Sequence, residues 1–435
     1  MSGILQDSDW DLNEVGHVIV CRFSFKCQKK AGPIRCFAWL RSCMLVLLLG
    51  LILSDAMGQN KNFKLGPVYF AAAATLAIEF NDNVSNSATN PKSDLIVSPG
   101  LSLDSAWNIS EVNQLSFDLG IGYRKYLNNS ELDSGSNFLD ITPDTRLAFN
   151  VFIDTLTLEF YDAFNYSIEA TDAFARDAQG NVITNVAQYG RFENQVGVML
   201  AWDLNDLKIN GELSRLDLFA QDAAFGFTER NTHTLSASAL FLFAPNLTAG
   251  LLGSAKMTDY RENFQNDGIT YSLGPQFTWQ PTALIGVSGS FGYTLSQFDI
   301  GGGNGDTSDS NSIFWNLNIK HRAARYYSHS LGFSRSTRFG FVSNTTEISR
   351  VRYRAEWRMA RAITFFGGVG YEFHNDSGGL SAEEFDRHVF DIATKYAHSS
   401  QVSSQIFYTF STKDSSLSSR SFNRNRIVFS LQYDF

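Results

Sequence analysis

The chain has 435 residues, of which 44% are hydrophobic, 14% aromatic and 18% charged, and its formal net charge is −9. This composition is too apolar for a disordered chain. The acidic balance argues against nucleic acid as a partner, because phosphate binding needs clustered Lys and Arg. The sequence holds no run of 18 or more apolar residues, which excludes a bundle of membrane-spanning helices.

The first 58 residues have the order of a secretory signal. An apolar run over 45–53 follows a basic stretch and precedes the small residues Ala56 and Gly58. This order predicts an extended signal peptide over 1–58, cleaved after Gly58. A membrane anchor is the alternative, although the run is about half as long as a bilayer crossing requires. All four cysteines precede Gly58, so we expect neither disulfides nor thiolate metal sites in the mature chain.

From residue 66 onward, bulky apolar residues alternate with small or polar ones over segments of about 10–15 residues. In the segment 115–124, Leu115 and Phe117 alternate with Ser116 and Asp118, and the segments 269–279 and 285–295 repeat the pattern. A period of two indicates strands with one apolar face. These strands are longer than the 5–6 residues typical of soluble domains.

Short turns and longer connections alternate along this region. Short turns are predicted near residues 110, 153, 204, 245, 281, 323, 360 and 398. Connections rich in Gly, Asn, Asp and Ser are predicted at 81–94, 128–137, 170–189, 220–232, 260–268, 299–311, 338–346, 374–384 and 412–421. Short turns on one rim and long loops on the other are typical of transmembrane barrels, whereas a propeller needs four short strands per repeat.

The predicted fold is therefore all-β: a transmembrane, antiparallel, up-and-down β-barrel of about 18 strands, with 16 as the alternative. It covers residues 66–435, after a short periplasmic N-terminus over 59–65. Three prolines fall inside predicted strands, where proline removes a ladder hydrogen bond, so we expect bulges or strand sections beyond the bilayer there. They are Pro99, Pro143 and Pro275.

Aromatic residues recur at the short-turn end of every second strand, except the one that ends near Ile319. This position predicts a periplasmic aromatic girdle, because rings with an apolar body and a polar edge are favoured at a membrane interface; ordinary core aromatics are the alternative. The girdle residues are Trp107, Phe149, Trp202, Phe243, Trp279, Trp357 and Tyr396, with Phe435 in the equivalent place at the chain end.

The last strand alternates through Phe429, Leu431 and Tyr433 to a terminal Phe435. It resembles the C-terminal signature by which the insertion machinery recognises Gram-negative outer-membrane barrels. The resemblance covers about residues 66–435. It implies a place in the cell outer membrane, in contact with lipid, lipopolysaccharide and that machinery. The FNDNV run at 80–84 is similar to the start of the β-barrel porin type 2 family, which includes outer-membrane proteins of exopolysaccharide operons.

A barrel of 18 strands is expected to enclose a water-filled lumen. Arginines on the polar face of the strands would form an electropositive ladder that favours anions. The candidates are Arg350, Arg352, Arg354 and Arg358 on one strand, Arg424 and Arg426 on the last, and Arg124, Arg146 and Arg191 on early strands. The equally weighted alternative is a bracing lattice of salt bridges with Glu159, Glu193, Glu212, Glu356, Glu372 and Asp391.

We therefore expect a porin-like channel for passive diffusion of small hydrophilic solutes, leaning toward anions. Alternatives are an accessory barrel for exopolysaccharide export or assembly, and a structural or adhesive barrel with a blocked lumen. The connection 170–189 either folds inward as a constriction or stays outside. We expect no enzyme activity, cofactor or metal, since the histidines lack metal-ligand spacing. For the oligomeric state, the sequence is compatible with both a monomer and a homotrimer. The histidines are His233, His321, His329, His374, His388 and His398.

Overall fold

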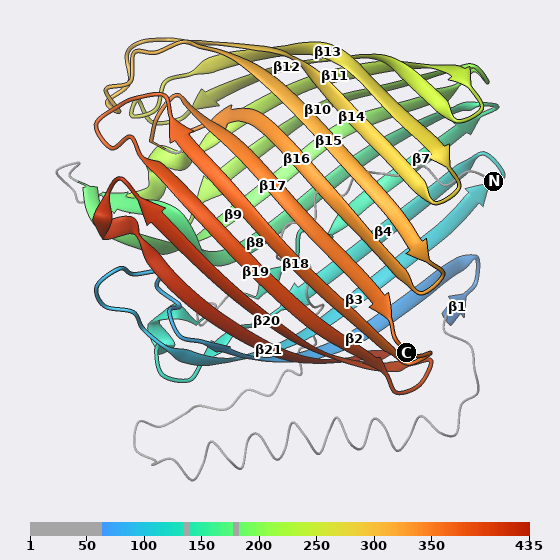
Figure 1. Ribbon diagram of the computed structural model, residues 1–435, viewed down its shortest axis with the longest axis horizontal. Helices are drawn as coiled ribbons and strands as arrows, with labels where there is room; N and C mark the ends of the chain where they lie inside the picture. The colour runs from blue at the N-terminus through green and yellow to red at the C-terminus, as the bar shows by residue number, and fades with distance from the viewer. Residues whose placement is uncertain (1–62, 134–138, 177–181, 341) are drawn as a thin grey trace.

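The computed structural model describes residues 63–133, 139–176, 182–340 and 342–435, so the predicted signal segment 1–58 lies outside the described residues. Within them the chain forms one antiparallel sheet that closes on itself as a barrel of strongly tilted strands (Figure 1). Eighteen long strands make the wall in this described part, which confirms the predicted fold and strand number against the alternative of 16.

The wall strands in chain order are β2 (Val68–Asn81), β3 (Asp94–Ser110), β4 (Asn113–Gly122), β7 (Arg146–Ile153), β8 (Leu156–Arg176), β9 (Val182–Asp203), β10 (Leu207–Ala220), β11 (Arg230–Ala244), β12 (Leu247–Tyr260), β13 (Gly268–Thr282), β14 (Ile285–Phe298), β15 (Ser310–Ala324), β16 (Tyr327–Phe339), β17 (Thr345–Arg358), β18 (Ile363–Asp376), β19 (Glu384–Ala397), β20 (Val402–Ser415) and β21 (Phe422–Asp434). Shorter elements are β1 (Phe63–Leu65), β5 (Lys125–Tyr126), β6 (Asp140–Ile141) and the 3-10 helices η2 (Ser130–Leu132), η3 (Ala223–Thr228) and η4 (Ser418–Arg420). In the part of the chain that the structure describes, no helix is both long and apolar enough to cross a membrane.

The first and last strands close the ring. β2 pairs with β3 on one side and with β21 on the other, in a ladder from Ala73 opposite Asp434 to Asn81 opposite Arg426. β1 pairs with the start of β2, so residues 63–65 of the predicted N-terminal segment form a strand. A closed sheet has no edge, so the wall pairs its backbone groups internally, as a wall in contact with lipid must.

The strand ends define two rims, which we call the short-turn rim and the loop rim. Short turns lie at 111–112, 154–155, 204–206, 245–246, 283–284, 325–326, 359–362 and 398–401, at or within two residues of the predicted positions. The prediction of a loop over 170–189 is wrong, because β8 runs to Arg176 and β9 starts at Val182. This hairpin extends the wall, and β9 contacts η4 of the β20–β21 connection, beside which it lies in Figure 1.

The three prolines lie at interruptions of the ladder. Pro143 sits in the bulge between β6 and β7, where β4 changes register by two residues. Pro99 faces the gap where β3 passes from β4 to β5, and the β13–β14 ladder skips Pro275. Proline has no backbone N–H to donate, and at each of these three positions the ladder is interrupted, so no pairing hydrogen bond is lost. The predicted bulge is found at Pro143, whereas the ladders at Pro99 and Pro275 resume in the same register.

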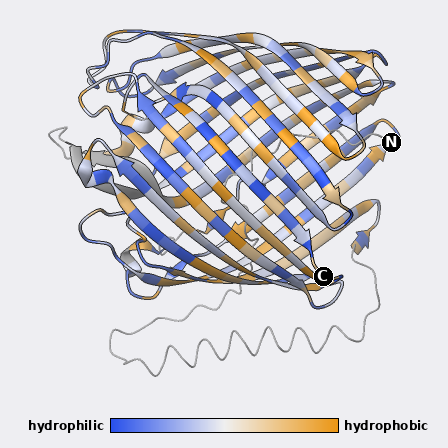
Figure 2. Cartoon of the chain, viewed as in Figure 1, coloured by the Kyte–Doolittle hydropathy of each residue, from blue (hydrophilic) through white to orange (hydrophobic). Residues whose placement is uncertain are grey.

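The two faces of the wall differ in chemistry, and hydrophobic and hydrophilic residues alternate along the strands in Figure 2. Leu213 of β10 and Leu235 of β11 pair on one face and are 60% and 56% exposed, and Leu273 of β13 is 65% exposed. Their neighbours on the opposite face, such as Ser214, are polar and buried. Aliphatic side chains exposed to this extent around a ring fit a lipid-facing surface.

The apolar face has a defined height. In β9 it runs from Trp202 through aliphatic residues to Asn194, and in β21 it runs from Phe435 to Asn425. Spans of 8–10 residues, rising about 3.3 Å each and tilted by roughly 40°, cover about 20–25 Å, which is the thickness of an outer-membrane barrel's apolar belt. At the edge of this apolar face nearer the loop rim, Asn194 donates a hydrogen bond to Asp162 (2.5 Å). The wall therefore presents an apolar belt with polar borders.

The FNDNV run closes the seam between β2 and β21 at the loop rim. Asp82 accepts hydrogen bonds from the backbone N–H and the side-chain amide of Asn425, both at 2.7 Å. Asn83 is 2% exposed, and its amide donates to the carbonyls of Ser87 (2.9 Å) and Asn423 (3.0 Å). The run therefore fastens the first strand to the last.

Replacement of Asn83 by Ala should lower the stability of the closed barrel. The variant loses two donated side-chain hydrogen bonds in a buried position, and we expect a loss of about 2 kcal/mol. The midpoint of heat-modifiable migration on gels measures this change. Asn90→Ala, in the exposed part of the same connection, serves as the control and should leave the midpoint unchanged. Equal midpoints for Asn83→Ala and the unmodified chain would contradict the assigned role.

Candidate functional site

The inner face of β17 carries the predicted ladder. Alternation places Arg350, Arg352, Arg354 and Arg358 on the face opposite Val351, which is 38% exposed on the apolar side. Carboxylates accompany them. Arg350 Nε lies 2.6 Å from Glu372, Arg352 Nη2 lies 3.7 Å from Asp391, and Arg358 Nε lies 2.9 Å from Glu356. The strand therefore presents ion pairs instead of bare guanidinium groups.

Glu372 is the centre of the strongest of these contacts. Its side chain is 9% exposed and receives Arg350 from β17, Arg387 from β19 (2.6 Å) and His374 (3.3 Å). The register explains the meeting, because Glu372 stands opposite both Arg350 and Arg387. Three strands are thus joined through one carboxylate.

A second centre forms where β18 has no side chain. Gly368 lies between Arg354 of β17 and Asp391 of β19 in register. A Cβ at Gly368 would overlap the Asp391 carboxylate, so glycine lets this side chain lie across β18 toward Arg352. The absence of a side chain on β18 therefore sets the contact between β17 and β19.

The other predicted arginines also have polar partners. Arg426 of β21 lies 2.8 Å from Glu79 of β2, across the seam, and Arg424 donates to Asn86 Oδ1 (3.0 Å). On the early strands the pairs are Arg124 with Asp140 (2.8 Å), Arg146 with Glu159, and Arg191 with Glu193 (3.2 Å), while Glu212 accepts from Tyr161 (2.7 Å). The geometry of a bracing lattice is therefore present, and the role of the same arginines in selectivity stays a prediction.

The loop rim holds a buried polar network that the sequence did not reveal. We call Asn266, Asn304, Asp306, Asn344 and Ser377 the loop cluster; they come from four connections. Asn266 donates to Asn344 Oδ1 and to the Asp306 carbonyl, both at 2.7 Å, and Ser377 donates to the Asp306 carboxylate at 2.6 Å. The first four are 1–3% exposed. Four hairpins therefore share one set of hydrogen bonds at the mouth of the barrel.

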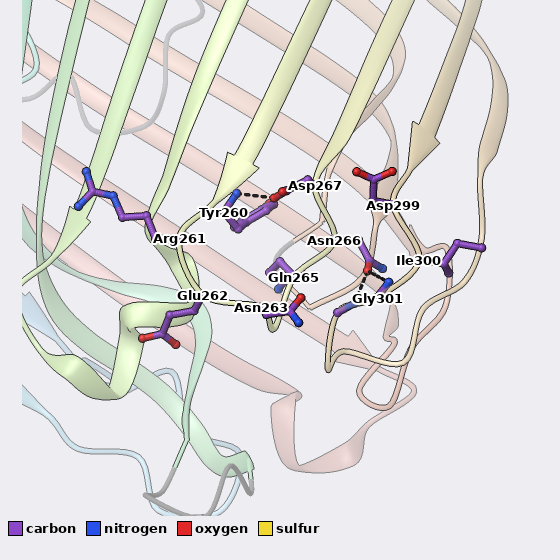
Figure 3. A pocket seen from close by; sticks show the side chains of 11 residues that line it. Tyr260, Arg261, Glu262, Asn263, Gln265, Asn266, Asp267, Asp299, Ile300 and Gly301 are labelled. Carbon is purple, nitrogen blue, oxygen red and sulfur yellow. Dashed lines mark hydrogen bonds between the residues drawn. The ribbon is translucent and has the colours of Figure 1, made fainter.

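A polar pocket and a group of aromatic contacts lie near the loop cluster at the mouth of the barrel. In Figure 3, Asn266 points toward Gly301 and accepts its backbone N–H (3.1 Å), on one side of a polar pocket of about 440 Å³. Beside it, Tyr189 of β9 stacks on Phe225 of η3 with ring centroids 4.2 Å apart, and Phe227 meets Phe264 edge-on at 5.4 Å. The aromatic contacts attach the β8–β9 hairpin and η3 to the connection that holds Asn266.

The predicted girdle residues lie beside the short-turn rim. Six of the seven are 39–69% exposed and Phe149 is half-buried; the exposed ones are Trp107, Trp202, Phe243, Trp279, Trp357 and Tyr396. In the last strand, Phe429 is 43% exposed, and the Tyr433 ring meets Phe435 edge-on at 5.0 Å. These positions fit an interfacial belt, and recognition by the insertion machinery stays a prediction.

Two of the histidines meet in the structure. His321 Nδ1 and His329 Nε2 lie 3.0 Å apart across the β15–β16 hairpin, near Tyr327 and Tyr353. The turn predicted near 323 lies at 325–326, and a hairpin centred two residues earlier would not place His321 opposite His329. Among the described residues, no group of three or more His, Cys, Asp or Glu could hold a metal ion.

No family model matches the chain, and no curated protein matches it. Among solved structures it is similar to OccAB3 of Acinetobacter baumannii, at 11% identity and a TM-score of 0.49, over 84% of this chain and 99% of that one. The outer membrane protein OpdK of Pseudomonas aeruginosa gives the same four values. A BenF-like porin from Pseudomonas fluorescens Pf-5 matches at 10% identity and a TM-score of 0.48, over 84% and 99%. At these values no conclusion about function passes from one chain to the other.

The chain's own surface gives its location. A closed antiparallel wall with an apolar belt about 20–25 Å high is the architecture of a cell outer-membrane barrel. The finer resemblance to the β-barrel porin type 2 family stays a prediction.

Glu372→Gln should destabilise the barrel by about 3 kcal/mol, because Arg350 and Arg387 would keep their charges in a largely enclosed place without a carboxylate. Urea unfolding in lipid vesicles, followed by tryptophan fluorescence, measures the change. Glu356→Gln is the matched control: its partner Arg358 is 67% exposed, and such pairs contribute less than about 1 kcal/mol. Equal losses for the two variants would contradict the central place of Glu372.

The loop cluster should depend on pH through Asp306. Burial alone would raise the pKa of this carboxyl, but hydrogen bonds from Ser377, Asn344 and Ser308 outweigh it and lower the pKa below its ordinary 3.8. The carboxylate therefore stabilises the cluster above pH 3.8, and this contribution is lost as the pH falls through the lowered pKa.

Backbone hydrogen exchange over 299–309, corrected for intrinsic rates, should accordingly stay slow above pH 3.8 and accelerate below it. Asp306→Asn should exchange faster at neutral pH, whereas Asp299→Asn, exposed on the same connection, should behave like the unmodified chain. Unchanged exchange in Asp306→Asn would contradict this role.

Proposed function

We propose that the chain is an outer-membrane channel through which small hydrophilic solutes diffuse passively, with a lean toward anions. The observation that carries the proposal is the opposition of the two faces: an apolar belt outside and charged side chains inside. Lys320 and Arg322, for example, lie on the inner face near the short-turn rim and are exposed. Exposed charges inside a closed wall require water, and a ring of 16–18 strands leaves room for an aqueous channel.

The anion lean rests on β17, where four arginines lie among three carboxylates, Glu356, Glu372 and Asp391. Cationic groups on a pore wall raise the local concentration of anions, and this local field matters more than the net charge of the chain. Because Arg352 and Arg354 share Asp391, removal of both cations would leave that stretch of the wall negative.

The refolded protein in planar bilayers should show stepwise conductance, and its anion/cation permeability ratio should fall when Arg352 and Arg354 become Ser. Reversal potentials in a salt gradient measure the ratio. Arg215→Ser, on the apolar outer side beside Asp217, is the control and should leave the ratio unchanged. An unchanged ratio in the double variant would contradict the anion lean, and the absence of any conductance would contradict the channel.

The second candidate is an accessory barrel for exopolysaccharide export or assembly. It rests on the FNDNV run, whose Asp82 and Asn83 also have the seam contacts described above. This candidate predicts neighbouring genes for glycosyltransferases and a polysaccharide exporter, with no intrinsic conductance of the purified barrel. The structural barrel with a blocked lumen predicts no conductance and no such genes.

A further inference from the structure

Three cations near the loop rim lie close together, and each lacks an ion-pair partner among the described residues. Arg230 of β11 and Lys256 of β12 belong to the inner face by alternation. Arg338 of β16 is next to Phe339, whose ring lies beside Lys256, and the charges that act on Lys256 are those of Arg230 and Arg338. In the stretches that the structure describes, none of the three forms an ion pair. They differ in this from the arginines of β17.

Aromatic rings accompany two of these cations. Lys256 Nζ lies 5.7 Å from the ring centre of Phe339, and the Arg230 guanidinium lies 5.9 Å from that of Tyr260. A ring face attracts a cation through its quadrupole without neutralising the charge. Lys256 and Arg338 are also exposed to solvent. Their charges are therefore held in place and remain available to a solute.

The side chains that separate Arg230 from Lys256 on this face of the wall are neutral, and the nearby Asp267 accepts the backbone N–H of Tyr260 (2.6 Å) and forms no ion pair with Arg230. Thr232 and Thr258, 3% and 0% exposed, stand opposite each other on β11 and β12 and are hydrogen-bonded to each other at 3.0 Å. Arg230 donates to the neutral carbonyl of Thr228 at 3.5 Å. Like charges near a low-dielectric wall repel one another. An anion with several charged oxygens removes this repulsion better than chloride, because one molecule can contact more than one cation.

We propose that Arg230, Lys256 and Arg338 form a binding site for a multiply charged oxyanion, of the phosphate or sulfate class, on the lumen wall at the loop rim. The site deepens the proposed function, since it rests on a lumen that solutes can enter. It would hold such anions at the mouth before they pass the ion pairs of β17.

The test uses the refolded chain in detergent, titrated calorimetrically with sodium pyrophosphate and separately with sodium sulfate at an ionic strength of about 20 mM, where screening is weak. Lys256→Gln combined with Arg338→Gln should weaken binding at least about tenfold, or about 1.4 kcal/mol. Lys320→Gln combined with Arg322→Gln removes the same charge near the short-turn rim and should leave binding unchanged. Lys256→Arg should keep it.

Binding of pyrophosphate alone would assign the site to phosphate groups, and equal binding of both would assign it to oxyanions in general. Absence of binding, or equal loss in the two double variants, would overturn the site. Gel migration identifies folded variants, and the single variant Lys256→Gln replaces a double variant that does not fold. Conductance without binding overturns the site alone, whereas binding without conductance overturns the channel and leaves the site standing.

Discussion

The rest of the structure depends on closure of the sheet. A strand in contact with lipid cannot leave its N–H and C=O groups unpaired, because each such group costs several kcal/mol in hydrocarbon. The pairing of β2 with β21 removes the two edges that eighteen strands would otherwise expose. Once the ring is closed, alternation divides the side chains between lipid and lumen, and register decides which of them meet.

Register also explains the chemistry of the lumen. Glu372 meets Arg350 and Arg387 because the three stand opposite one another on neighbouring strands. Asp391 reaches Arg352 because Gly368 has no side chain. Most charges on this wall are therefore paired with an opposite charge, whereas Arg230, Lys256 and Arg338 form a cluster of cations without an ion pair among the described residues, which suggests a bound anion.

The sequence predicted the barrel because its strongest signals, alternation and the spacing of turns, are local. Trp202 and Phe435 could be placed at the short-turn rim for the same reason. The loop cluster could not be predicted: Asn266, Asn304 and Asp306 lie in connections whose composition suggests loops but does not say which loops fold together. The sequence named the ladder arginines and the carboxylates Glu356, Glu372 and Asp391, but not which of them meet, because each contact depends on the register between neighbouring strands. The segment 170–189 was misread because its polar composition concealed a continued strand pair.

The seam also sets the order of events in folding. Asp82 and Asn425 are separated by 343 positions, so their hydrogen bonds cannot form until nearly the whole chain has been synthesised. Such distant pairing is slow, and until it occurs the sheet presents two unpaired edges to any strand it meets. The nascent protein must therefore be kept from self-association between its synthesis and the arrival of its final thirteen-residue strand.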